Sequence, residues 1–157
     1  MENLENMEEI EALQTELGLF LADMIPVPWK KICFYAECSP GTASTWFAFV
    51  EQETGVICTR GFFWNRYDTY KYPERAAVKR LLDYAADLYK AYVKKVGQDK
   101  VWSTMYYTLE SDGAVHIDLE FELPSDNILE VRNAVYRKFF HTEPKHYDTK
   151  YPSKELK

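Results

Sequence analysis

Apolar residues recur at steps of three and four in three segments of the chain, which is the spacing of one buried face of an α-helix. The first segment covers residues 7–24 and ends before a pair of prolines, which cannot continue a helix. The second covers residues 73–96. The third covers residues 128–139, and either Ser125 or Asp126 stands where a residue can cap its first turn. These segments predict three helices.

Between the helical segments, apolar and polar residues alternate in short runs bounded by turn residues, which predicts strands with one buried face. Three runs follow the first helix and two follow the second, so the order is α-βββ-α-ββ-α. We expect a single α+β domain in which helices pack against one antiparallel five-stranded sheet. The expected strands cover approximately residues 29–37, 45–51, 56–62, 101–109 and 115–123.

The chain has 157 residues and a net charge of −6 that is unevenly distributed. Residues 1–16 hold six Glu and no basic residue, and residues 101–131 hold seven acidic residues and no Lys or Arg. Such a balance provides no basic field for nucleic acid, so we expect none as a partner. The 12 Tyr, 9 Phe and 4 Trp instead favour strands and protein contact surfaces.

The densest group of chemically active side chains lies in residues 111–123, SDGAVHIDLEFEL. His116, Asp118, Glu120 and Glu122 share one parity along this run, and apolar residues share the other. A strand therefore places the polar side chains in a straight row about 6.8 Å apart, whereas a calcium site curves the chain around the ion. We interpret the row as the solvated face of a strand; a metal site there needs ligands from other strands.

No catalytic motif for a serine hydrolase, a nucleotide-binding loop or a zinc protease occurs in the sequence, so we expect neither enzymatic activity nor a cofactor. Cys58 with His116 remains as a possible nucleophile and base of a small hydrolase. The three cysteines lack metal spacing and are interpreted as reduced thiols. Cys33 and Cys38 differ in parity and should point to opposite faces of their strand.

The N-terminal residues lack the basic and apolar regions of a signal peptide, and no apolar run reaches the roughly 18 residues of a membrane span. We therefore expect a cytoplasmic protein without a membrane partner. Residues 145–157 are polar and are interpreted as a C-terminal tail, with the domain at 1–144. His141 and His146 flank this boundary, where exposed histidines usually have no special role.

Residues 61–72, GFFWNRYDTYKY, are interpreted as an aromatic loop and a candidate contact surface. Trp64, Arg66, Tyr67 and Tyr70 are the residue types that dominate interface hot spots. The alternative interpretation is that part of the loop folds back over the core as a cover. It applies most to three residues, Phe62, Phe63 and Trp64.

Two segments each follow an amphipathic helix and carry a recognisable pattern, MIPVPWKKICFYAE at 24–37 and VWSTMYYTLESDGAVHIDLEFEL at 101–123. Together they resemble the YezG/EsaG-like immunity proteins, or antitoxins, of Gram-positive bacteria. The similarity extends over approximately residues 10–144, and the S-D-G…I-D hairpin is its most specific part. The resemblance implies a cytosolic protein that binds and neutralises a cognate secreted toxin, often a nuclease.

A nuclease carries a basic groove for phosphates, so an acidic surface can dock there quickly and in a salt-dependent manner. From parity and charge we hypothesise that Asp112, Asp118, Glu120 and Glu122 form part of the toxin-facing surface. The competing hypothesis is a non-catalytic adaptor without a toxin partner, and a homodimer formed through the aromatic loop is one form of it. A small hydrolase is the third possibility, and it requires a pocket that joins its nucleophile to a base.

Overall fold

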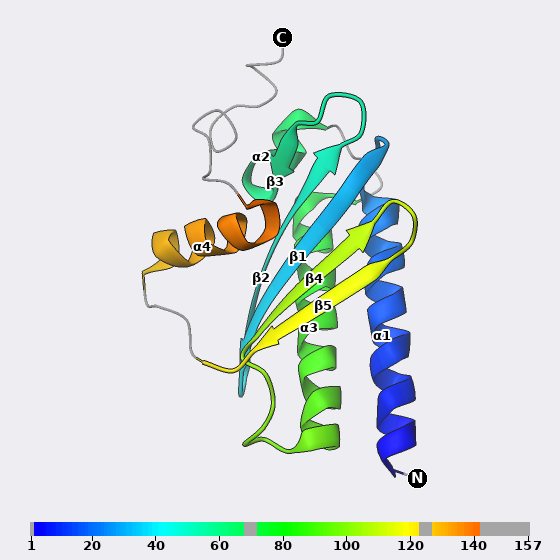
Figure 1. Ribbon diagram of the computed structural model, residues 1–157, viewed down its shortest axis with the longest axis vertical. Helices are drawn as coiled ribbons and strands as arrows, with labels where there is room; N and C mark the ends of the chain where they lie inside the picture. The colour runs from blue at the N-terminus through cyan, green and yellow to red at the C-terminus, as the bar shows by residue number, and fades with distance from the viewer. Residues whose placement is uncertain (1, 68–71, 123–126, 142–157) are drawn as a thin grey trace.

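Four helices and five strands make up residues 2–67, 72–122 and 127–141, which are the residues described by the computed structural model (Figure 1). The predicted order α-βββ-α-ββ-α is confirmed, and one short helix, α2, is added after the third strand. The elements are α1 (Glu2–Met24), β1 (Trp29–Ser39), β2 (Thr42–Glu51), β3 (Ile57–Thr59), α2 (Arg60–Arg66), α3 (Glu74–Val96), β4 (Thr104–Glu110), β5 (Val115–Glu120) and α4 (Ile128–Phe140).

The five strands form one antiparallel sheet in the order β3-β2-β1-β4-β5. β1 is the central strand and its residues 32–36 are all buried. It pairs with β2 through a tight hairpin and with β4 across a sequence separation of about seventy residues. The β4–β5 hairpin therefore completes the sheet on one side, while β3 ends it on the other.

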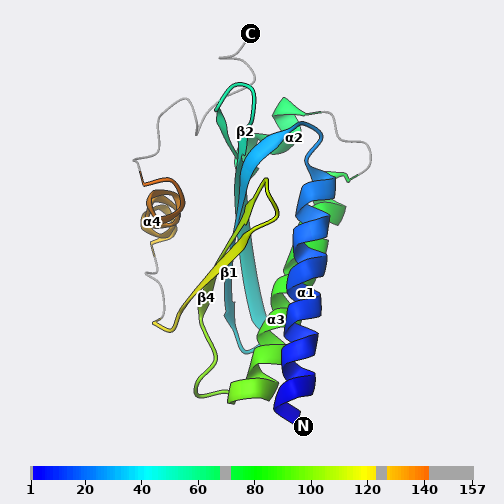
Figure 2. The same cartoon turned by 45° about the vertical axis from the view of Figure 1, so that its right-hand side comes forward.

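Helices α1 and α3 lie antiparallel to each other and cover one face of the sheet (Figures 1 and 2). Their periodic apolar residues supply most of the main core, including Leu17, Leu21, Leu81 and Leu88, each at most 1% exposed. The Gln14 amide of α1 donates to the Tyr92 hydroxyl of α3 at 3.3 Å. Among the described residues, no helix is both long and apolar enough to cross a membrane.

Among the described residues, helix α4 is the one helix on the other face of the sheet, so this part of the chain forms three layers (Figure 2). Val135 and Phe139 are buried against Tyr35 of β1 and Tyr106 of β4. The Phe139 ring meets the Tyr106 ring edge to face, with centroids 5.3 Å apart. This second, smaller core fixes the position of α4 over the middle of the sheet.

Three details of the sequence interpretation change. The loop expected over residues 61–72 is wrong for its first half, because α2 occupies Arg60–Arg66 and β3 ends at Thr59. Helix α2 places Phe63 fully inside the core, and this burial stabilises the helix. A segment of seven residues is too short for its periodicity to predict a helix. Helix α4 is capped by Asn127, whose side chain accepts hydrogen bonds from two backbone amides. The proposed caps Ser125 and Asp126, the tail 145–157 and His146 lie outside the described residues.

The opposite orientation of two neighbouring cysteines is confirmed. Cys33 lies in the small core under α4, and Cys38 lies in the main core beside α3. Burial raises the pKa of each of these thiols to about 12, and the pKa of Cys58 likewise. All three cysteines are therefore protonated, inert core residues at neutral pH.

Candidate functional site

The polar row of β5 faces the same side of the sheet as α4. Ile117 and Leu119, of the other parity, are half buried against the main core. Asp118 and Glu120 point away from that core, and their side chains are 64% and 48% exposed. The alternation in the sequence therefore identifies both faces correctly for residues 117–120, although the polar face is shared with a helix. The expected strand 115–123 is too long, because β5 ends at Glu120, and Val115 and Phe121 are 43% and 62% exposed.

Lys138 of α4 lies between the two carboxylates of this row. Its Nζ is 2.7 Å from Asp118 Oδ2 and 3.0 Å from Glu120 Oε2, and it stands over the Tyr106 ring at 4.5 Å from the centroid. The hydrogen bond to Asp118, together with that to Glu120, raises the pKa of Lys138. The acidic row lacks basic neighbours in the sequence, but in space it already holds one cation. This face of the protein thus holds the ammonium group of Lys138 between two carboxylates and an aromatic ring.

A cleft of about 540 Å³ opens beside Lys138, between α4 and strands β1, β4 and β5. We call it the α4 cleft. Its lining comprises Tyr35, Thr104, Tyr106, Glu120, Glu122, Glu130, Val131, Ala134, Val135 and Arg137. Among the described lining residues, three carboxylates outnumber one guanidinium. Burial raises the pKa of Tyr35 and Tyr106, and nearby carboxylates, Glu37 and Glu120 respectively, raise it further. Both phenols therefore keep their protons at neutral pH.

The other two members of the predicted acidic surface lie at the ends of the β4–β5 hairpin. Asp112 is in the turn, where its Oδ1 accepts a hydrogen bond from the Ala114 amide at 2.9 Å. Glu122 follows β5 and its side chain is exposed. Its carbonyl oxygen accepts a hydrogen bond from Ser103 Oγ at 2.7 Å, which holds the backbone beside the α4 cleft. Glu122 thus lies beside Glu120 at the cleft, whereas Asp112 lies at the opposite end of the β4–β5 hairpin.

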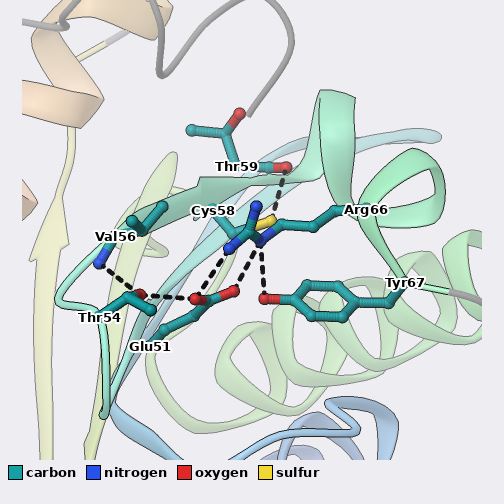
Figure 3. Close-up of polar contacts among 7 residues, drawn as sticks. All are labelled: Glu51, Thr54, Val56, Cys58, Thr59, Arg66 and Tyr67. Carbon is teal, nitrogen blue, oxygen red and sulfur yellow. Dashed lines mark hydrogen bonds and ion pairs between the residues drawn. The ribbon is translucent and has the colours of Figure 1, made fainter. Parts of the chain in front are cut away.

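The aromatic segment lies at the other edge of the sheet, and Arg66 within it is bound inside the fold. Figure 3 shows its guanidinium paired with Glu51. Arg66 Nε donates to Glu51 Oε2 at 2.7 Å and to the Tyr67 hydroxyl at 3.1 Å, while a terminal nitrogen donates to Glu51 Oε1 at 3.0 Å. Thr54 donates to the same carboxylate at 2.6 Å. With side chains 11% and 9% exposed, Arg66 and Glu51 fasten α2 to the end of β2.

Trp64 also packs inward, in agreement with the interpretation that this segment covers the core. Its ring meets Phe47 and Phe63 edge to face, and its indole N–H donates to the Tyr72 carbonyl at 3.0 Å. Tyr67 packs against Phe49 and Phe63. Tyr70 lies outside the described residues. The structure therefore joins Trp64, Arg66 and Tyr67 to one another and to the core, and separates them from the acidic row by the width of the sheet.

The possible Cys58–His116 pair is wrong. Cys58 is on β3 and His116 on β5, the two edge strands, with three strands between them. Adjacent strands lie about 4.8 Å apart, so the two residues are separated by roughly 19 Å. Within the described part of the chain, no group of three or more His, Cys, Asp or Glu residues is arranged to hold a metal ion.

Sequence reasoning missed the residues that give the α4 cleft its floor. Tyr35, Thr104 and Tyr106 belong to two strands that pair only in the folded chain. Parity along each strand shows which of their side chains share a face, but the register between β1 and β4 is needed to place them together. Lys138 was missed for the same reason, since nothing in the sequence places α4 on the acidic face.

These observations define an α+β protein whose sheet has helices on both faces and an acidic cleft under its last helix. A family model described as "Immunity protein YezG-like" matches residues 10–153. The chain belongs to the YezG-like immunity protein family. A comparison with curated proteins gave no match.

Proposed function

We propose that this immunity protein acts in the cytoplasm by binding and neutralising a secreted toxin whose contact surface is basic, as in a nuclease. The toxin docks against the acidic face formed by Asp118, Glu120 and Glu122, with Asp112 at the far end of the hairpin. Neutralisation occurs by protein–protein contact without catalysis by this chain. Membership of an immunity family supports a protein partner, and the charge of this face supports a basic one.

The observation that carries the proposal is the exposure of the carboxylates on one ordered face. Asp118 and Glu120 are fixed by strand β5, and both remain accessible although Lys138 contacts them. An acidic row that is ordered before binding loses little conformational entropy when a partner docks. A nuclease groove provides several Lys and Arg side chains for phosphates, and the row presents carboxylates in their place.

Co-expression in bacteria tests this function. The wild-type chain should protect cells from a cognate nuclease-toxin domain, and the variant E120K/E122K should protect poorly. The matched control is E8K/E11K, which makes the same change of net charge at exposed positions of α1. Protection by E120K/E122K equal to that by E8K/E11K would exclude the acidic face, and failure of the wild type to protect would exclude the function.

A further inference from the structure

Thr104 places a buried hydroxyl in the floor of the α4 cleft without using it in the fold. The residue is 3% exposed, and among the described residues its Oγ1 has no hydrogen-bond partner. A buried polar group without a partner is destabilising, and native proteins keep few of them. In this cleft such a hydroxyl indicates a ligand that supplies the missing hydrogen bond.

The neighbours of Thr104 define the charge of that ligand. In the strand register, Thr104 stands opposite Glu37 of β1 on one side and opposite Glu120 of β5 on the other. Side chains that face each other across strands are about 4.5–5.5 Å apart at Cβ, so Thr104 lies between two glutamates. The Glu37 carboxylate accepts a hydrogen bond from the Tyr35 hydroxyl at 3.1 Å, and Glu120 lines the cleft. Glu122 adds a third at the mouth of the cleft. A cation that also donates hydrogen bonds fits this set of acceptors.

The aromatic walls of the cleft favour a guanidinium. Tyr35 and Tyr106 line it with their rings 5.2 Å apart, and Lys138 already stands over the Tyr106 ring. A guanidinium stacks on aromatic rings and donates five hydrogen bonds in one plane, whereas an ammonium is a point charge with a strongly held water shell. Glu120 holds Lys138 through Oε2, and a carboxylate accepts about four hydrogen bonds, so both cations fit.

We infer that the α4 cleft is the socket for an arginine side chain of the toxin, with Thr104 Oγ1 accepting a hydrogen bond from its guanidinium and Glu120 and Glu122 compensating its charge. This inference rests on the proposed function and identifies the part of the acidic face that gives it specificity. Arg137 of α4 lines the same cleft, so the local excess of negative charge is moderate and hydrogen-bond geometry determines selectivity.

Nuclear magnetic resonance titration tests the socket without the toxin. N-acetyl-arginine amide is added to the isotope-labelled full chain, with N-acetyl-lysine amide and NaCl at the same ionic strength as controls. We expect arginine-specific shifts that include Thr104, Tyr106 and Glu120, reduced at least several-fold in T104V and retained in T104S. Shifts indistinguishable from those with NaCl, or unchanged in T104V, would overturn the inference.

The matched control is T108V, because Thr108 lies on the same strand and the same face, opposite His116. T104V should weaken binding of the toxin domain roughly tenfold, the effect of one hydrogen bond to a charged group, while its urea midpoint stays equal to or above that of the wild type. T108V should leave the affinity unchanged. If the wild type binds toxin and T104V binds equally, the socket is wrong and the function stands. If the wild type binds no toxin, the function fails, and the arginine titration still decides the socket.

Discussion

Lys138 of α4 and Asp118 of β5 are joined by an ion pair of 2.7 Å across the gap between the third layer and the sheet. The same lysine contacts Glu120, so one cation of the protein's own chain occupies the middle of its acidic row. The contact attaches the end of α4 to the sheet and also reduces the negative potential of the face. The first role stabilises the face on which a partner docks, whereas the second weakens its attraction for a basic partner. A substitution of Lys138 separates the two effects.

Lys138→Met should therefore make association with a basic toxin faster while slightly lowering stability. Half-exposed ion pairs and a cation–π contact together contribute about 1 kcal/mol, so the loss in unfolding free energy should be of that order. Removing one positive charge from the docking face should raise the association rate at low salt. The control K79M removes a charge on α3, where Lys79 pairs with Asp83, and should not change the rate. Slower association of K138M than of K79M would show that Lys138 itself contacts the toxin.

Arg66→Met should destabilise the fold by about 2–4 kcal/mol, because it leaves the Glu51 carboxylate buried without its partner. Urea denaturation measures the change. The double variant E51L/R66M should recover part of the loss, since two apolar side chains leave no unpaired charge. K79M, which breaks an exposed ion pair, should cost under about 0.5 kcal/mol by comparison. An equally small effect of Arg66→Met would mean that α2 does not depend on this pair.

Acidification should remove the contribution of the Glu51 carboxylate to the stability of the fold. Burial opposes its ionisation, but hydrogen bonds from Arg66 and Thr54 outweigh burial and lower the pKa of this carboxyl in the folded state. The unfolded chain then binds the proton first as the pH falls, so stability decreases. The difference in urea midpoint between wild type and E51Q should be full near pH 7 and should shrink below about pH 4.3, the ordinary Glu value. A difference independent of pH would contradict this assignment.

Gly18→Ala should be destabilising, although alanine is normally the better helix residue by about 1 kcal/mol. A Cβ at position 18 of α1 would lie 2.5 Å from the hydroxyl oxygen of Tyr107, which donates to the Gln14 carbonyl at 2.9 Å. Displacing that ring should cost about 1–3 kcal/mol, and Y107F in the same chain should relieve part of it. Gly61→Ala in α2 is the control, because a Cβ there meets no atom within 4 Å. Thermal or urea unfolding should show a loss of stability for Gly18→Ala and no such loss for Gly61→Ala.

The sequence predicted the elements whose signals are local. Period-two alternation placed Ile117 and Asp118 on opposite faces of β5, and the parity of Cys33 and Cys38 assigned them to different cores. The family was also identifiable, from the hairpin of β4 and β5 and the segment around β1. The short helix α2 was not predicted, because seven residues contain too few helical turns to show a hydrophobic periodicity.

What the sequence did not predict depends on contacts between distant segments. The pairing of β4 with β1 and β5 places Thr104 between Glu37 and Glu120. The sequence of a single strand predicts neither the strand order nor the register. Likewise, an apolar stripe on α4 shows that the helix is buried on one side but not which face of the sheet it covers. Lys138 therefore met the acidic row only in the folded chain.

Stopped-flow association kinetics over a range of salt concentrations test the central claim, that a basic toxin docks on the acidic face, most directly. A cognate nuclease-toxin domain is mixed with the wild type, with E120K/E122K and with the charge-matched control E8K/E11K. We predict that wild type and control associate at rates that fall steeply and equally with salt, and that E120K/E122K associates at least tenfold more slowly at low salt with a flatter dependence. Identical rates and salt slopes for all three proteins would contradict the account.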